Sequence, residues 1–131
     1  AEIYSHLAES AHSRVMLAQG PYAAADVKQM CAHFDFVLTG RMHLMIAALG
    51  RDVPVLAMEY QGKFAGALAH FGLGQEQLME PADVCSSEKL HQRVCRQLDN
   101  LSSTRMQIKK LRPAVQTMAA AALLLKLGKQ T

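Results

Sequence analysis

Short apolar runs that alternate with helix-like segments are the feature that most constrains how this 131-residue chain can fold. Continuous apolar runs of four to six residues are typical of strands that are buried on both faces. Three runs of this kind are expected to form strands: residues 15–18, 36–39 and 53–58. Three other segments have the spacing of helices: residues 23–33, 41–49 and 64–71. Gly72 is expected to end the last of them as a C-cap. The alternation predicts one Rossmann-like α/β domain, with a parallel sheet covered by helices on both faces.

Both ends of the chain are expected to be helical. Residues 1–12 have an amphipathic pattern that starts without a capping residue, so we expect the chain to be part of a larger two-domain protein. After Pro81 the strand pattern stops, and residues 86–131 are expected to form a helical tail. Ser86 or Ser87 can cap the first tail helix, because serine side chains accept hydrogen bonds from the N–H groups of a first helical turn.

The second tail helix is expected to start at Ser102 or Ser103 and to kink or break at Pro113. Between residues 114 and 127 its polar residues are few: Gln116, Thr117 and Lys126. Such an apolar helix is not expected to remain uncovered at the surface of a domain. The helix can fold back on its own sheet or pair with the same helix of a second chain. We favour pairing, in a homodimer that buries side chains from this set: Leu123, Leu124 or Leu127.

Charge and cysteine content argue against several classes of function. The net charge is +3, and the one dense basic stretch, 105–112, resembles the solvated face of a helix, so nucleic-acid binding is not expected. Three cysteines without CxxC spacing favour free, buried thiols in the cytoplasm and no metal site: Cys31, Cys85 and Cys95. The longest apolar run, 118–125, is too short to span a membrane. No glycine-rich nucleotide motif occurs, and no cofactor is expected.

The helix expected at residues 41–49 carries its polar side chains at its start. Arg41 and His43 lie in its first turn, and nearly every residue from 42 to 49 is otherwise apolar, so we expect this helix to be buried almost all round. Ligands of open α/β sheets bind beyond the carboxyl ends of the strands. A helix N-terminus there attracts anions, and an arginine side chain adds a fork that suits carboxylate or phosphate.

The next strand and helix repeat this arrangement. The strand at 53–58 is followed by Tyr60 and Lys63, which we expect at the same edge of the sheet as Arg41. Lys63 would add a compact positive charge, and Tyr60 a hydroxyl group. The sequence therefore predicts an anion-binding site at this edge, with His43 as the group that can move a proton.

These residues resemble the polysaccharide pyruvyl transferase family. The family pattern is a hydrophobic strand, Arg-x-His, a helix rich in Ala and Leu, a Val-Pro strand and Tyr-x-x-Lys. The resemblance covers residues 35–73 and includes Arg41, His43, Tyr60 and Lys63. One departure is Asp52, which stands where a small glycine usually precedes Val-Pro, so we expect the turn to differ.

The resemblance implies two Rossmann-like domains that face each other across a cleft, as in type B glycosyltransferases, with this chain as the carboxy-terminal one. It implies transfer of the enolpyruvyl unit of phosphoenolpyruvate to the hydroxyls of a polysaccharide or its precursor. Arg41 and Lys63 would hold phosphate and carboxylate, Tyr60 would contribute to substrate binding, and His43 would be catalytic. Much of the acceptor site would lie in the amino-terminal domain, so the chain is expected to be inactive alone.

Two other readings remain open. The chain can be the nucleotide-sugar half of a type B glycosyltransferase or epimerase, although the helix at 41–49 has no acidic residue to hold ribose or sugar hydroxyls. It can also be a non-catalytic relic or interaction domain that keeps the fold and binds a partner.

Overall fold

A parallel sheet lies at the centre of the molecule. The computed structural model describes residues 6–60 and 62–127. In this part of the chain, the sheet has three strands in the order β1-β2-β3: β1 (Val37–Thr39), β2 (Val55–Met58) and β3 (Leu78–Met79). Both pairings are parallel, with Val37 opposite Val55 and Ala57 opposite Leu78. The Rossmann-like α/β class is confirmed, and so are two of the expected strands, whereas β3 was not expected.

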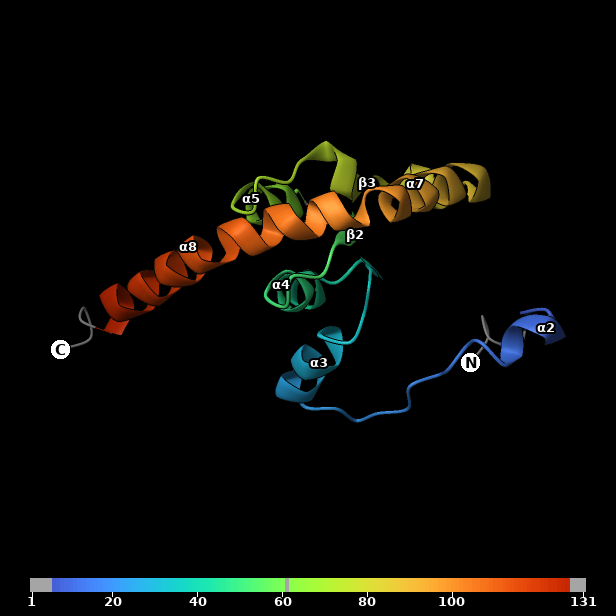
Figure 1. Ribbon diagram of the computed structural model, residues 1–131, viewed down its shortest axis with the longest axis horizontal. Coiled ribbons are helices and arrows are strands. Elements are labelled where there is room, and N and C mark those ends of the chain that lie inside the picture. The colour runs from blue at the N-terminus through green and yellow to red at the C-terminus, as the bar shows by residue number, and fades with distance from the viewer. Residues whose placement is uncertain (1–5, 61, 128–131) are drawn as a thin grey trace.

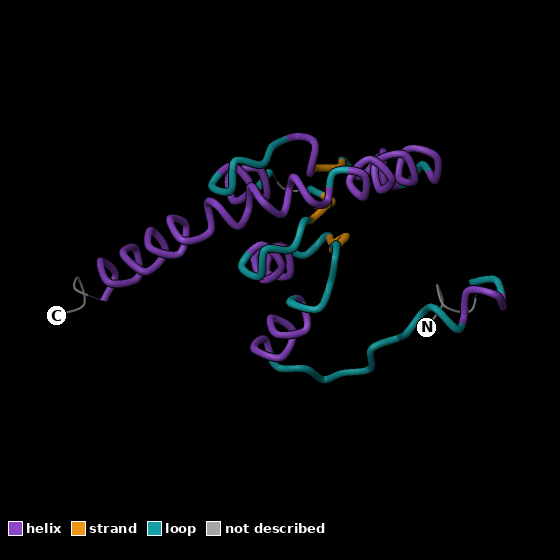
Figure 2. Tube along the Cα trace, in the orientation of Figure 1, coloured by secondary structure: helices purple, strands orange, loops and turns teal. Residues whose placement is uncertain are grey.

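Most of the helices lie around this sheet, whereas the first described one lies apart from it (Figure 1), and loops connect them (Figure 2). The helical elements before β3 are α2 (Glu9–His12), α3 (Ala24–Cys31), α4 (Met42–Leu49), α5 (Phe64–Ala69) and the 3-10 turn η1 (Gln75–Gln77). Those after β3 are α6 (Pro81–Val84), α7 (Ser87–Asp99) and α8 (Leu101–Leu127). The helix expected at residues 1–12 therefore forms over its last four residues, and residues 1–5 lie outside the described part.

The strand expected at residues 15–18 is not formed, and that prediction was wrong. Residues 15–19 have no regular structure, and the side chain of Met16 is 91% exposed. Figure 2 shows this segment as part of a long loop that runs from α2 to α3, away from the sheet. A short apolar run becomes a strand only where a partner strand lines up with it, which the local pattern cannot reveal.

One face of the sheet packs into the main core. Val37, Val55 and Ala57 lie in a single cluster with buried side chains of α3, α4, α5 and α8. Successive strand residues point to opposite faces, so Leu38 lies on the other face, where its side chain is 40% exposed. That face is therefore left open at the β1 side of the sheet.

Helix α4 is less buried than expected. Met45, Ala48 and Leu49 are buried against the sheet, but Ile46 is 46% exposed and His43 is exposed on the same side of the helix. The prediction of a helix buried nearly all round was wrong because no described element covers its outer side. An apolar sequence shows that a helix can be buried. How much of its surface is buried depends on which elements pack against it.

Two predicted helix ends are confirmed in atomic detail. Ser86 Oγ accepts a hydrogen bond from the Lys89 N–H at 3.4 Å and so caps α7. Gly72 has a φ of +66° just after α5, and the Leu73 N–H reaches back to the Leu68 carbonyl at 3.1 Å. This is the Schellman arrangement, in which a left-handed glycine lets the chain leave the helix.

Helix α8 is long, and it extends beyond the rest of the molecule (Figure 1). It begins at Leu101, so Ser102 and Ser103 lie in its first turn and do not precede it as predicted, because a single residue, Asn100, joins it to α7. The helix also continues through Pro113, which was expected to kink or break it. A proline removes one backbone N–H donor, and here its ring is exposed, so the remaining hydrogen bonds can continue the helix.

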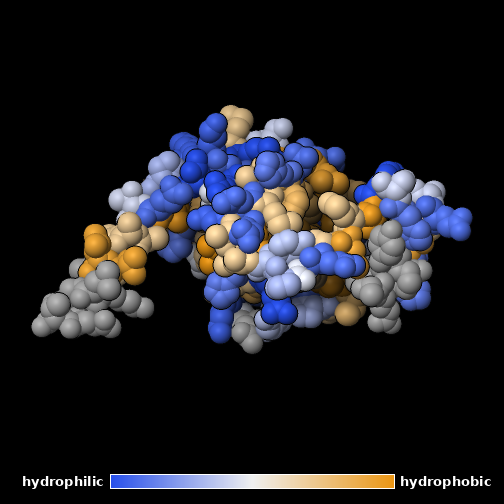
Figure 3. Space-filling model, turned by 90° about the horizontal axis from the view of Figure 1, so that it is seen from below, coloured by the Kyte–Doolittle hydropathy of each residue, from blue (hydrophilic) through white to orange (hydrophobic). Residues whose placement is uncertain are grey.

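The projecting end of α8 is apolar and exposed. Figure 3 shows apolar side chains gathered there, away from the main body. Leu123 and Leu124 are 60% and 69% exposed. The side chain of Leu127 lies outside the described part.

Candidate functional site

The turn that follows β1 is held by Thr39. This buried residue ends the strand, and its Oγ1 accepts a hydrogen bond from the Arg41 N–H at 2.9 Å. Gly40 lies between them, with Met58 of β2 close to the position that a Cβ would occupy, at 3.6 Å. A hydroxyl that accepts from the backbone two residues later replaces a backbone hydrogen bond in the turn. Thr39 therefore fixes where the backbone of Arg41 enters α4.

Arg41 is the N-cap residue of α4, and His43 lies in the first turn of that helix. Both side chains are exposed. No described side chain caps this helix, so its first N–H groups have no side-chain acceptor. The start of α4 therefore combines unpaired backbone donors, the positive end of a helix dipole, a guanidinium group and an imidazole.

The turn that follows β2 is held by Glu59. Its Oε1 accepts a hydrogen bond from the Phe64 N–H at 2.7 Å, at the start of α5. Its backbone N–H donates to the Met79 carbonyl of β3 at 2.9 Å. These two contacts define the ends of the loop that carries Tyr60 and Lys63, and both of these side chains are exposed.

The sheet topology places both turns at one edge. β1 and β2 are neighbouring parallel strands, with Thr39 opposite Ala57, so Arg41 and Lys63 follow adjacent carboxyl ends. In the described part of the chain, no hydrogen bond, ion pair or ring contact joins Arg41, His43, Tyr60 and Lys63 to one another. The four residues therefore share one edge of the sheet but do not contact one another. The anion site stays a prediction.

A cavity of about 540 Å³ opens beside this edge, beyond the ends of β2 and β3. Of the predicted site residues, Tyr60 lines it, whereas Arg41, His43 and Lys63 do not. Its acidic lining was not predicted and comes from four residues: Glu59, Glu76, Glu80 and Asp83. The sequence signal for this lining is that Glu59 follows the apolar run at 53–58 and Glu80 follows Leu78–Met79. The second run has only two residues, which is too short to predict a strand.

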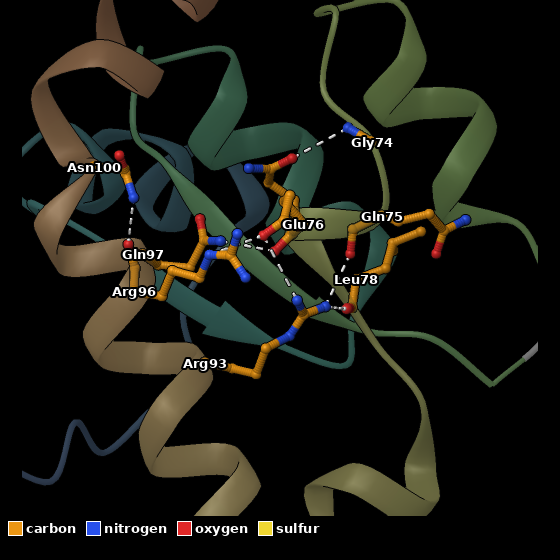
Figure 4. Close-up of polar contacts among 9 residues, drawn as sticks. Gly74, Gln75, Glu76, Leu78, Arg93, Arg96, Gln97 and Asn100 are labelled. Atoms are coloured by element: carbon orange, nitrogen blue, oxygen red, sulfur yellow. Dashed lines mark hydrogen bonds and ion pairs between the residues drawn. The ribbon is translucent and has the colours of Figure 1, made fainter.

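Helix α7 forms one wall of the cavity through Arg93 (Figure 4). This guanidinium donates to the Gln75 carbonyl at 2.9 Å and to the Leu78 carbonyl, and it lies 3.7 Å from the Glu76 carboxylate. Buried Gln97 donates to the Glu76 carbonyl at 2.7 Å, one turn further along the helix. These contacts attach the loop before β3 to α7, because they satisfy its carbonyl groups.

Asp83 also lines the cavity and pairs with Lys89, 2.6 Å away. The hydrogen bond with Asp83 and the charge of that carboxylate raise the pKa of the Lys89 ammonium. Both groups are well exposed, so solvent weakens the pair.

The three cysteines are free thiols. Cys31 is buried as expected, whereas Cys85 and Cys95 are exposed, so the prediction of buried thiols was wrong for those two. Burial raises the pKa of the Cys31 thiol, and the charge of Arg51 partly opposes that rise. Among the described residues, no three His, Cys, Asp or Glu side chains gather in a way that could hold a metal ion.

Comparison with known proteins gives one family match, over the first part of the chain. Residues 1–62 match the family model described as polysaccharide pyruvyl transferase. The matched segment includes Arg41, His43 and Tyr60 and ends one residue before Lys63. No curated protein and no solved structure matches the chain. Within the described residues, no helix has the length and apolarity needed to cross a membrane.

Proposed function

We propose that the chain, whose residues 1–62 match the family model described as polysaccharide pyruvyl transferase, forms the donor-binding domain of such an enzyme. The donor is phosphoenolpyruvate, and the acceptor is a sugar hydroxyl of a polysaccharide or its precursor. One observation carries the proposal: Arg41 and His43 stand exposed at the uncapped start of α4, beyond the carboxyl end of β1. This is the edge at which α/β sheets bind ligands.

The proposed chemistry divides the work among these residues. Phosphoenolpyruvate is a small anion with a phosphate and a carboxylate, which suit Arg41, Lys63 and the N–H groups of α4. His43 gives a proton to the methylene carbon, which leaves the adjacent carbon electron-poor. A sugar hydroxyl attacks that carbon and loses its proton, and the bond between that carbon and the phosphate oxygen breaks, which releases phosphate. A second hydroxyl of the same sugar then adds to the same carbon and loses its proton, which completes a cyclic ketal. Tyr60 contributes to substrate binding from the neighbouring loop.

The wider setting is also part of the proposal. The family resemblance supports a second Rossmann-like domain that faces this edge across a cleft, as in type B glycosyltransferases. Free thiols support a cytoplasmic location, because disulfides form mainly in oxidising compartments. The exposed apolar end of α8 supports a homodimer through this helix, since burying Leu123 and Leu124 removes apolar surface from water.

Binding of phosphoenolpyruvate, measured by calorimetry, tests the proposed function. We expect Arg41→Ala to weaken binding at least about tenfold, because a charge-assisted contact is lost. Arg51→Ala is the matched control, since Arg51 is an exposed arginine just beyond the other end of α4. Equal effects of the two substitutions would contradict the proposal. Binding of a nucleotide sugar without any binding of phosphoenolpyruvate would favour the glycosyltransferase reading.

A further inference from the structure

The acidic cavity beyond β2 and β3 differs in chemistry from the predicted anion site beside it. Its walls come from three parts of the fold: the loop after β2, the segment around β3, and α7. Its volume of about 540 Å³ is large enough for one or two sugar rings, since small-molecule sites span roughly 300–1,000 Å³.

The charges that line the cavity disfavour an anion. Arg93 is the one cation among its lining residues in the described part, and its guanidinium is engaged with the Gln75 and Leu78 carbonyls and with Glu76. The Glu80 carbonyl accepts hydrogen bonds from the Asp83 and Val84 N–H groups, but its carboxylate has no hydrogen bond or ion pair within the described residues. A phosphate or carboxylate in this cavity would therefore meet unbalanced negative charge, which makes it unsuitable for phosphoenolpyruvate.

The same lining favours a neutral molecule with many hydroxyl groups. Ionised carboxylates accept hydrogen bonds, and sugar hydroxyls can donate them. Tyr60 adds an aromatic surface: the residue is 63% exposed, and its ring lies tilted against Phe64, with the ring centroids 6.5 Å apart. Exposed aromatic rings can pack against the apolar face of a sugar ring while their hydroxyl stays in water.

We propose that this cavity is this domain's part of the acceptor site, where a neutral pyranose is held by Glu80 and the free oxygen of Glu59 and packed on Tyr60. This rests on the proposed function, because it assigns the second substrate of that reaction. The loop from Glu59 to Phe64 links the two sites: its start lines the cavity, and Lys63 precedes α5 at the other end. A sugar in the cavity would thus lie next to the edge where Arg41 and His43 hold the donor.

A divalent cation is the competing occupant of an acidic cavity. Two of the carboxylates are already engaged, Glu76 with Arg93 and Arg96, and Asp83 with Lys89. No described group of three acidic, histidine or cysteine side chains is placed to surround an ion. Calcium and magnesium need several converging oxygen ligands, so the arrangement favours the sugar.

Saturation-transfer NMR on the full chain tests this proposal with methyl β-D-galactopyranoside and methyl α-D-mannopyranoside as neutral probes. We expect at least one of them to bind, and Glu80→Gln and Tyr60→Ala each to weaken it about three- to tenfold, because a charge-assisted hydrogen bond or a ring contact is lost. The matched controls lie outside the cavity: Glu88→Gln on α7 and Tyr22→Ala in the loop before α3, which should leave binding unchanged.

Three outcomes would overturn the proposal: no transfer to either probe, equal effects of cavity and control variants, or calcium binding that Glu80→Gln removes. The result is separable from the donor assignment. If the two sites exist as proposed, Glu80→Gln weakens sugar binding and spares phosphoenolpyruvate, whereas Arg41→Ala does the reverse. If the unmodified chain binds phosphoenolpyruvate but neither sugar, the acceptor proposal fails and the donor proposal is unaffected. If it binds a sugar but not phosphoenolpyruvate, the cavity is a sugar site and the proposed function fails.

Discussion

Arg112 Nε lies 2.6 Å from Asp52 Oδ1 and ties the middle of α8 to the turn between α4 and β2. Asp52 has a φ of 61°, the left-handed conformation that a glycine adopts with least strain. Its N–H donates to the Leu49 carbonyl, and the next N–H, of Val53, donates to the Ala48 carbonyl. Asp52 thus takes up a conformation that suits a glycine, and the expectation that the turn differs from that of the family stays a prediction.

Substitutions at Asp52 should separate conformation from charge. Asp52→Ala keeps the strain and loses the ion pair, and we expect it to lower the free energy of unfolding by about 1–2 kcal/mol. Asp52→Gly loses the pair but relieves the strain, so it should be the less damaging change. Urea unfolding measures both. A double-mutant cycle with Arg112→Ala should give a coupling of about 0.5–1 kcal/mol for this partly buried pair, and a coupling of zero would show that the contact contributes nothing.

Two glycines near α5 should respond in opposite ways to alanine. A Cβ at Gly72 would lie 2.7 Å from Gln107 Nε2, at a φ of +66°, whereas a Cβ at Gly66 meets nothing within 4 Å. Gly72→Ala should cost about 1–3 kcal/mol of stability. Gly66→Ala should add about 0.5–1 kcal/mol, because alanine is the better helix former. Thermal unfolding measures both variants. If Gly72→Ala and Gly66→Ala shift the unfolding temperature in the same direction, the description of this helix end is wrong.

Thr39 should act on donor binding through the backbone of Arg41. Thr39→Val removes the hydrogen bond to the Arg41 N–H and should weaken phosphoenolpyruvate binding about three- to tenfold, since a lost hydrogen bond is worth roughly 1 kcal/mol. Thr39→Ser keeps the hydroxyl and should restore most of the affinity. If Thr39→Val and Thr39→Ser weaken phosphoenolpyruvate binding equally and the two variants are equally stable, the hydroxyl does not position Arg41.

The three thiols should differ in reactivity. Cys85 and Cys95 are exposed and should react with a thiol reagent such as dithionitrobenzoate in the native protein at pH 8. Cys31 should react only after unfolding, because it is buried and burial raises the pKa of its thiol. Mass spectrometry of the labelled peptides assigns each site. Rapid native labelling of Cys31 would mean that α3 opens from the core.

The end of α8 should control association. If the helix pairs with its copy, light scattering should show a dimer, and Leu123→Glu together with Leu124→Glu should give a monomer. The matched control is Gln116→Glu, which adds charge outside the apolar end. A monomer at high concentration for the unmodified chain would disprove the homodimer.

Local pattern was sufficient for the elements whose signals lie within a few residues. Apolar runs that ended at turn residues identified β1 and β2, and a serine and a glycine identified the cap of α7 and the end of α5. The local pattern also placed Arg41 and Lys63 directly after two successive strands. Because neighbouring parallel strands end at the same edge of a sheet, the two residues were expected at one edge. These inferences hold because capping, turn geometry and side-chain period act between neighbouring residues.

Tertiary structure decided everything that depends on a distant partner. Residues 15–18 have a strand pattern but pair with nothing, and the outer side of α4 is apolar but uncovered. Glu59, Glu80 and Arg93 are far apart in sequence, and the order of the strands and the docking of α7 bring them around one cavity. Arg112, sixty residues after Asp52, pairs with it, a contact that the local sequence does not reveal. A sequence determines which contacts each residue can make, whereas packing decides which of those contacts form, because the partners are chosen by the whole chain.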